Sequence, residues 1–211
     1  MKTIYLIRHG ETDNNLNKIL QGGNVNIGLN EKGRQQAEAF YQKYRSAPFK
    51  KIYTSSLIRS IESVEKFIAK GIPHEAIKEL NEISYGIYDG KISSEGKNSS
   101  YRRLVSAWDN GDLSAKMEGG ESPLEVQERL EHVLEYILRQ KEEDPILICM
   151  HGRAMRIFLA TVLNYDLSYM HLFTHQNLGL YILQYTGKMF FIEKFNDTVH
   201  LRNLDLQKAP L

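Results

Sequence analysis

Cysteine is almost absent from this sequence of 211 residues, which contains only Cys149. A single cysteine excludes an internal disulfide and any zinc cluster built on cysteine ligands. Cys149 lies inside a short apolar run, where a cysteine usually packs as a small hydrophobic residue. We therefore expect it to be buried and unreactive.

Long apolar stretches are also missing. No run approaches the roughly 18 residues that a membrane-spanning helix requires, so we expect no such helix. The chain begins with Met1 and Lys2 and enters a strand-like run at once, without the charged, apolar and small-residue regions of a secretion signal. We expect a cytoplasmic protein.

Neither sign of charge is in large excess, because the sequence contains 27 Lys and Arg residues and 26 Asp and Glu residues. This balance does not indicate a nucleic-acid footprint or a basic membrane-binding face, so we expect neither partner. Any anion site must be local, and a homodimer is compatible with these totals. The length and the hydrophobic content of 42% predict one domain over residues 1–211.

Two short apolar runs end in the same dipeptide, His-Gly. Residues 3–7 lead into Arg8 and His9, and residues 145–150 lead into His151, which a helical pattern follows. Continuous apolar runs of this length are typical of buried parallel strands, whose ligands collect at the carboxyl ends of the sheet. The sequence therefore predicts an α/β fold in which the two histidines face one crevice.

The rest of the chain alternates helical and strand patterns. Helices are expected at residues 31–45, 57–68, 101–108, 123–138 and 153–163, and strands at 51–54, 76–80, 178–185 and 189–195, the last two as a hairpin. Arg59 falls in the first turn of the second helix, where free N–H groups favour an anion. Residues 85–120 are rich in Ser, Gly and Asn, and we expect an excursion over the carboxyl edge of the sheet.

Residues 11–28 are polar and show no steady period, so we expect a long loop. Long loops within compact domains often carry function, which makes Asn15, Gln21 and Gly22 candidates for lining the crevice. For each of these residues, a role in turn geometry alone is an equal alternative.

The residue types limit the chemistry. Arginine gives bidentate, charge-assisted hydrogen bonds that suit phosphate oxygens, and neutral histidine offers a nucleophilic nitrogen. Charge stabilisation is the main task in phosphoryl transfer, and arginines can supply it in place of a metal. Arg8 and Arg59, with the two histidines, therefore suggest phosphoryl transfer.

The run Arg8-His9-Gly10-Glu11-Thr12, with Asn15 following, resembles the signature of the histidine phosphatase superfamily, the phosphoglycerate mutase-like enzymes. Further matches occur in order at Gln21-Gly22, Thr54-Ser55-Ser56-Leu57-Ile58-Arg59, Glu82, Gly120-Glu121-Ser122, His151-Gly152 and residues 196–201. The resemblance spans nearly the whole chain. It implies a three-layer sandwich with a mostly parallel central sheet flanked by helices, and an active site covered by the excursion at about 85–120.

By this resemblance, His9 is the nucleophile that becomes phosphorylated. Arg8, Arg59 and His151 hold the phosphoryl oxygens, and Glu82 donates a proton to the leaving alcohol. Neutral substrate contacts are expected from Asn15, Gln21 and Gly22. The resemblance implies no metal and no other cofactor.

Other polar residues are given structural interpretations. We interpret Arg102, Arg103, Arg153 and Arg156 as solvated or salt-bridged side chains, although each could reach an acidic group of a substrate. His175 matches no catalytic position, and Trp108 is expected to anchor the excursion.

These features favour hydrolysis of a small phosphorylated metabolite through a phosphohistidine. The closest rival is a cofactor-dependent phosphoglycerate mutase of the same fold, in which Arg102 and Arg103 would hold a carboxylate. A metal-dependent hydrolase with His9, His151 and Glu82 as ligands is disfavoured, because neighbouring arginines would repel the cation. A silent phospholigand-binding module is the third alternative, and the physiological substrate stays open.

Overall fold

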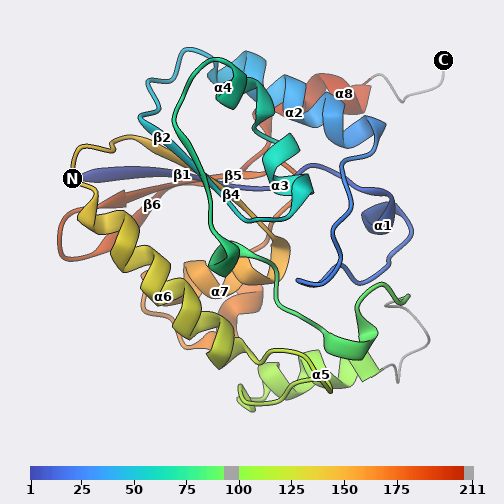
Figure 1. Cartoon of the computed structure of the whole chain (residues 1–211). Helices are drawn as coiled ribbons and strands as arrows, with labels where there is room; N and C mark the ends of the chain where they lie inside the picture. The colour runs from blue at the N-terminus through green and yellow to red at the C-terminus, as the bar shows by residue number, and fades with distance from the viewer. Residues whose placement is uncertain (93–99, 207–211) are drawn as a thin grey trace.

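The computed structural model of the chain describes residues 1–92 and 100–206. Its centre is a six-stranded sheet in the order β3-β2-β4-β1-β5-β6 (Figure 1). β3, β2, β4 and β1 run parallel to one another, β5 pairs antiparallel with β1, and β6 pairs antiparallel with β5. The strands are β1 Lys2–Arg8, β2 Lys51–Thr54, β3 His74–Ala76, β4 Ile146–Met150, β5 Leu180–Tyr185 and β6 Phe190–Asp197.

Helices cover both faces of this sheet. Figure 1 shows α2, α4 and α8 on one face and α6 and α7 on the other, which confirms the predicted three-layer α/β fold. The α-helices are α1 Asp13–Leu16, α2 Glu31–Tyr44, α3 Ile58–Glu62, α4 Glu65–Ala69, α5 Ser100–Asp109, α6 Pro123–Arg139, α7 Gly152–Val162 and α8 Arg202–Leu206. Short 3₁₀ turns lie at η1 Lys78–Leu80, η2 Gly86–Tyr88, η3 Leu167–Leu172 and η4 Val199–Leu201.

The central strands are apolar on both faces because both faces are covered. In β1, Ile4 and Leu6 pack into the core beneath α6 and α7. Ile7, the residue after Leu6, packs into the core on the opposite face with Phe40 of α2 and Phe67 of α4. This two-sided burial is the reason for the continuous apolar runs in the sequence.

Side-chain caps begin the two long amphipathic helices where the sequence predicts. The Asn30 side chain accepts a hydrogen bond from Gly33 N at the start of α2. Ser122 and Glu125 form a reciprocal capping box at the start of α6. Such caps satisfy N–H groups that the helix itself leaves free.

Three expectations about secondary structure are wrong. The loop at 11–28 contains the short helix α1, because Thr12 and Asn15 form a capping box. The helix expected at 57–68 is divided into α3 and α4 around Ser63, whose hydroxyl bonds Arg59 O and accepts from Gly10 N. Only residue 76 of the strand expected at 76–80 lies in a strand, because β3 covers His74–Ala76 and residues 78–80 form η1.

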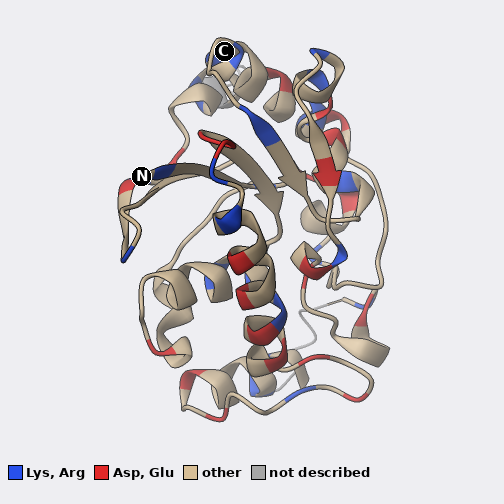
Figure 2. Cartoon of the chain, turned by 60° about the vertical axis from the view of Figure 1, so that its left-hand side comes forward, with Lys and Arg blue, Asp and Glu red and all other residues tan. Residues whose placement is uncertain are grey.

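Charged residues of both signs are interspersed over the helices and loops in Figure 2. Within the described ranges, no helix is long and apolar enough to cross a membrane. Part of the predicted excursion, residues 93–99, lies outside the described residues, as do residues 207–211.

Candidate active site

Three strands end level with one another at the carboxyl edge of the sheet. The register pairs Arg8 with Met150, and Thr54 with Cys149, so the residues that follow each strand are neighbours. His9 and His151 meet here, with ring centroids 5.1 Å apart. The prediction that both face one crevice holds only for His9, because His151 is fully buried and is not among the residues that line the cavity described below. Parallel pairing of β1 and β4 therefore joins two residues that are distant in sequence.

His9 is held in one tautomer. Its Nδ1 donates a hydrogen bond of 2.7 Å to the carbonyl oxygen of Gly10, so the neutral ring carries no hydrogen at Nε2. Burial, followed by the nearby charges of Arg59 and Arg8, holds the pKa of His9 well below its usual range. The ring is therefore neutral, with a free lone pair at Nε2.

Arg59 and His151 form a buried pair behind the cavity wall, and both side chains are fully buried. Arg59 Nε donates to His151 Nδ1 over 3.2 Å, and His151 Nε2 lies 2.7 Å from the hydroxyl of Ser55. Burial and the neighbouring Arg59 hold the pKa of His151 well below its usual range. Burial also lowers the pKa of Arg59 to about 10, so its guanidinium stays charged at neutral pH.

Glu82 follows η1, and its carboxylate lies against the N-terminus of α7, where the helix offers free N–H groups and a partial positive charge. One carboxylate oxygen accepts hydrogen bonds from the N–H groups of Ala154, at 2.8 Å, and Ile83, at 2.9 Å. The other oxygen accepts from Arg153 N at 2.9 Å. Backbone groups thus fix the carboxylate at the edge of the cavity.

Arg8 is oriented by His175, a residue that the sequence did not identify. The Nη1 atom of Arg8 lies 3.4 Å from His175 Nδ1. Burial and the charge of Arg8 lower the pKa of His175 to about 2, so the imidazole is neutral and its Nδ1 can accept this hydrogen bond. Gly152 makes room for the ring, because a Cβ at that position would lie 2.9 Å from His175 Cε1.

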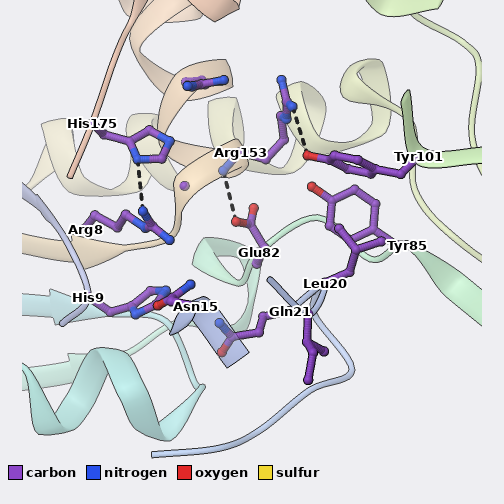
Figure 3. Close-up of a pocket in the computed structure, with 13 residues that line it drawn as sticks. Arg8, His9, Asn15, Leu20, Gln21, Glu82, Tyr85, Tyr101, Arg153 and His175 are labelled. Atoms are coloured by element: carbon purple, nitrogen blue, oxygen red, sulfur yellow. Dashed lines mark hydrogen bonds between the residues drawn. The ribbon is translucent and has the colours of Figure 1, made fainter. Parts of the chain in front are cut away.

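These groups surround a cavity of about 250 Å³ (Figure 3). It is lined by Arg8, His9, Asn15, Ile19, Leu20, Gln21, Glu82, Tyr85, Tyr101, Gly152, Arg153, Arg156 and His175. Five of the predicted site residues are therefore at its surface. Arg59 and His151 lie behind it.

Two predicted amide side chains are oriented by Thr12. Its hydroxyl donates to Gln21 Oε1 at 2.9 Å, and its N–H donates to Asn15 Oδ1 at 3.2 Å. Gln21 Nε2 is buried and has no hydrogen-bond partner among the described residues. The amide N–H groups are therefore the groups left to face a ligand.

Gly22, the remaining predicted contact, does not line the cavity as the structure describes it. A Cβ at this position would lie 2.0 Å from Asp89 Oδ1 and 2.7 Å from Ile83 O. Glycine is required here for close packing, which differs both from the expected substrate contact and from the alternative role in turn geometry.

The excursion supplies Tyr85 and Tyr101 to the cavity, and no sequence pattern predicts either residue there. Trp108 has the anchoring role that was predicted, because it is fully buried and its Nε1 donates to Ala115 O at 2.8 Å. Burial raises the pKa of the Cys149 thiol, in line with the expected packing role.

The interpretation of Arg153 as a solvated or salt-bridged side chain is wrong, and Arg156, which is half-buried, lies beside the same cavity. Both line the cavity, and Arg153 is only 7% exposed. Arg102 and Arg103 are exposed on α5 and are not among the described lining residues. The sequence did contain a signal that these two arginines could reach the site, because Arg153 and Arg156, like Arg59, fall near the start of a helix that follows a strand.

No three His, Cys, Asp or Glu side chains within residues 1–92 and 100–206 converge as ligands for a metal ion. His9, His151 and Glu82, the ligand set of the metal-hydrolase alternative, do not form such a group. The cations around them are guanidinium groups.

Known proteins resemble this chain over most of its length. The protein named probable phosphoglycerate mutase GpmB from Cronobacter sakazakii is 32% identical over 168 residues, which are 77% of this chain and 75% of that protein. The 6-phosphofructo-2-kinase/fructose-2,6-bisphosphatase of Gallus gallus is 34% identical over 165 residues, and the match spans only 33% of that enzyme.

Solved structures have the same fold. The phosphoserine phosphatase of Entamoeba histolytica, determined with 3-phosphoglyceric acid, superimposes with a TM-score of 0.83 at 27% identity. This match covers 95% of the present chain and 100% of the other. The family model of the histidine phosphatase superfamily, branch 1, matches residues 4–198. The chain therefore belongs to the histidine phosphatase superfamily.

Proposed function

We propose that this chain is a metal-independent phosphatase that hydrolyses a small phosphorylated metabolite through a phosphohistidine on His9. The observation that carries the proposal is the hydrogen bond from His9 Nδ1 to Gly10 O, which leaves Nε2 as a free nucleophile beside Arg8. A neutral imidazole needs no separate base to attack phosphorus.

In the first step, His9 Nε2 attacks the phosphorus atom and forms a P–N bond while the ester P–O bond breaks. The leaving oxygen takes a proton from Glu82, which must enter this step protonated, and the alcohol departs. Arg8 and Arg59 stabilise the charge on the phosphoryl oxygens, with His151 fixed by Arg59 and Ser55.

In the second step, water attacks the phosphohistidine and gives a proton to the Glu82 carboxylate. The P–N bond breaks, its electron pair returns to His9 Nε2, and inorganic phosphate leaves. Both residues are then back in their starting states, so the cycle consumes only ester and water. Asn15 and the unpartnered Gln21 Nε2 are proposed as neutral donors to the phosphoryl group.

The arginines are proposed to supply the positive charge that a metal supplies in other phosphatases. Several relatives have names that fit such an activity, among them the phosphoserine phosphatase of Entamoeba histolytica and the fructose-2,6-bisphosphatase enzymes. The cytoplasmic location and the homodimer stay predictions.

The mutase alternative is kept because the Cronobacter sakazakii relative is named as a probable phosphoglycerate mutase. The two functions share the first step and differ in whether water or a bound hydroxy acid attacks the phosphohistidine. A panel of phosphomonoesters, with released phosphate and interconversion of 2- and 3-phosphoglycerate measured side by side, separates them. We expect phosphate release to dominate, and interconversion much faster than release would overturn the assignment.

A further inference from the structure

We propose that the substrate carries a second anionic group, a carboxylate or another phosphate, which Arg153 and Arg156 bind at the far side of Glu82. This inference rests on the proposed function for the position of the scissile phosphate. It adds the requirement that the alcohol part of the substrate carries an anionic group, because hydrolysis of the phosphate ester does not itself need one.

The first observation is an excess of positive charge in the cavity. Three guanidinium groups line it, those of Arg8, Arg153 and Arg156, and Glu82 is the only carboxylate among the lining residues that the structure describes. Arginine keeps its charge at all physiological pH values. The proposed mechanism uses only Arg8 and the buried Arg59 for the phosphoryl group, so the charges of Arg153 and Arg156 have no role in it.

The second observation is that these two arginines have unused hydrogen-bond donors. Arg153 Nη1 and Arg156 Nε are both buried and have no partner among the described residues. Leaving a buried polar group unpaired is costly, and more so for a charged one. Arginines three residues apart on a helix also repel each other, so an anion between them would relieve both penalties.

The third observation is that Arg153 is held in place without being neutralised. Its guanidinium lies 5.1 Å from the centre of the Trp108 ring, and its Nη2 atom lies 3.4 Å from the Tyr101 hydroxyl. Aromatic contacts orient a guanidinium and leave its charge available. A side chain that is oriented before the ligand arrives loses less entropy on binding.

The in-line geometry of phosphoryl transfer places the alcohol part of the substrate on the same side of Glu82 as Arg153. Phosphoryl transfer requires the leaving oxygen to lie roughly opposite the attacking atom, His9 Nε2. If Glu82 protonates that oxygen, the alcohol extends beyond Glu82 and away from His9. In the view of Figure 3, Glu82 lies between His9 and Arg153, so the alcohol would extend toward Arg153 and Tyr101.

The test measures binding by the wild-type protein to non-hydrolysable phosphonates in matched pairs. The ω-phosphonocarboxylates with two to four carbon atoms are compared by calorimetry with alkylphosphonates of the same length, and α,ω-bisphosphonates distinguish a phosphate from a carboxylate requirement. We expect at least one dianionic member to bind on the order of tenfold to a hundredfold more tightly than its partner, as charged hydrogen bonds in a buried site imply.

Three variants locate the effect. Arg153→Met and Arg156→Met should each reduce the preference to less than about threefold, with the affinity for alkylphosphonates nearly unchanged. Arg139→Met, at an exposed arginine of α6, is the matched control and should keep the full preference. The preference is the ratio of two affinities measured on the same protein. If Arg153→Met fails to fold, the ratio for Arg156→Met is therefore enough to test the proposal.

Equal binding of both members at every chain length, or a full preference in both variants, would overturn the proposal. Since binding needs no turnover, this outcome is distinguishable from a failure of the proposed function. Absence of phosphate release from every ester would overturn only the phosphatase assignment. Hydrolysis of phosphate esters of uncharged alcohols, together with no binding preference for dianionic phosphonates, would overturn only the second anion site.

Discussion

The guanidinium of Arg59 and the imidazole of His151 are joined by a hydrogen bond of 3.2 Å from Nε to Nδ1. A guanidinium can only donate, so His151 must accept at Nδ1 and carry its hydrogen at Nε2, which it donates to Ser55. The bond links the helix after β2 to the end of β4 and fixes the tautomer of His151. Arg59 therefore orients His151 as well as supplying positive charge.

Replacing Arg59 with alanine should lower kcat by on the order of a hundredfold or more, because a buried cation directly behind the wall of the cavity is lost and His151 loses its hydrogen-bond donor. Steady-state kinetics with a chromogenic phosphomonoester measures the effect, and Arg139→Ala on the outer face of α6 is the control. A kcat for Arg59→Ala within about threefold of the parent would remove Arg59 from the mechanism.

Glu82→Gln should have an effect that depends on the leaving group. For alkyl esters, we expect kcat to fall by roughly a hundredfold to ten-thousandfold, the usual contribution of a general acid. An aryl ester such as 4-nitrophenyl phosphate should lose much less in the phosphorylation step, because its leaving group needs no proton. Phosphorylation rates from rapid-quench experiments report that step directly, and an equal loss for both ester types would argue against proton donation by Glu82.

The buried histidines should stay neutral in mild acid. Burial and neighbouring arginines lower the pKa values of His9, His151 and His175, so NMR should find the His9 ring uncharged from pH 8 down to about 5.5. A titration midpoint of His9 near its ordinary value of about 6.5 would contradict this expectation.

The same shifts predict how stability depends on pH. Below about pH 6.5 the unfolded chain takes up protons at these three histidines and the folded chain does not. The free energy of unfolding should therefore fall as the pH decreases, by up to ~1.4 kcal/mol per pH unit for each histidine. Urea denaturation at a series of pH values between 7.5 and 5 measures this slope, and a stability that rises toward acid would have the wrong sign.

Extensive chelation should leave kcat nearly unchanged, because the proposed mechanism takes its positive charge from Arg8 and Arg59. The measurement compares dialysed and chelator-treated protein in the same phosphatase assay. Activity that disappears on chelation and returns with zinc or manganese would favour the metal-hydrolase alternative.

Much of the fold and part of the site follow from local sequence patterns. His9 and His151 were predictable because each follows an apolar run, and parallel pairing brings strand ends together. Arg59 was predictable from its place in the first turn of a helix. These residues depend on one strand or helix each, whose periodicity the sequence carries.

The residues that were missed depend on packing between distant segments. His175 lies in an irregular segment before β5, and only the space left by Gly152 puts its ring beside Arg8. Tyr101 reaches the cavity because α5 packs beside η3, which no periodicity predicts. For Arg153 the local signal existed, but exposed arginines are so common on helices that burial was not expected.

Covalent labelling of His9 tests the central claim most directly. The protein is mixed with a phosphomonoester, quenched within milliseconds to seconds and analysed by peptide mass spectrometry under neutral conditions. We predict an acid-labile adduct of about 80 Da, one phosphoryl group, on His9 and its absence from His9→Ala, which should also lose turnover. Full turnover by His9→Ala, together with no adduct on the parent protein, would contradict the account.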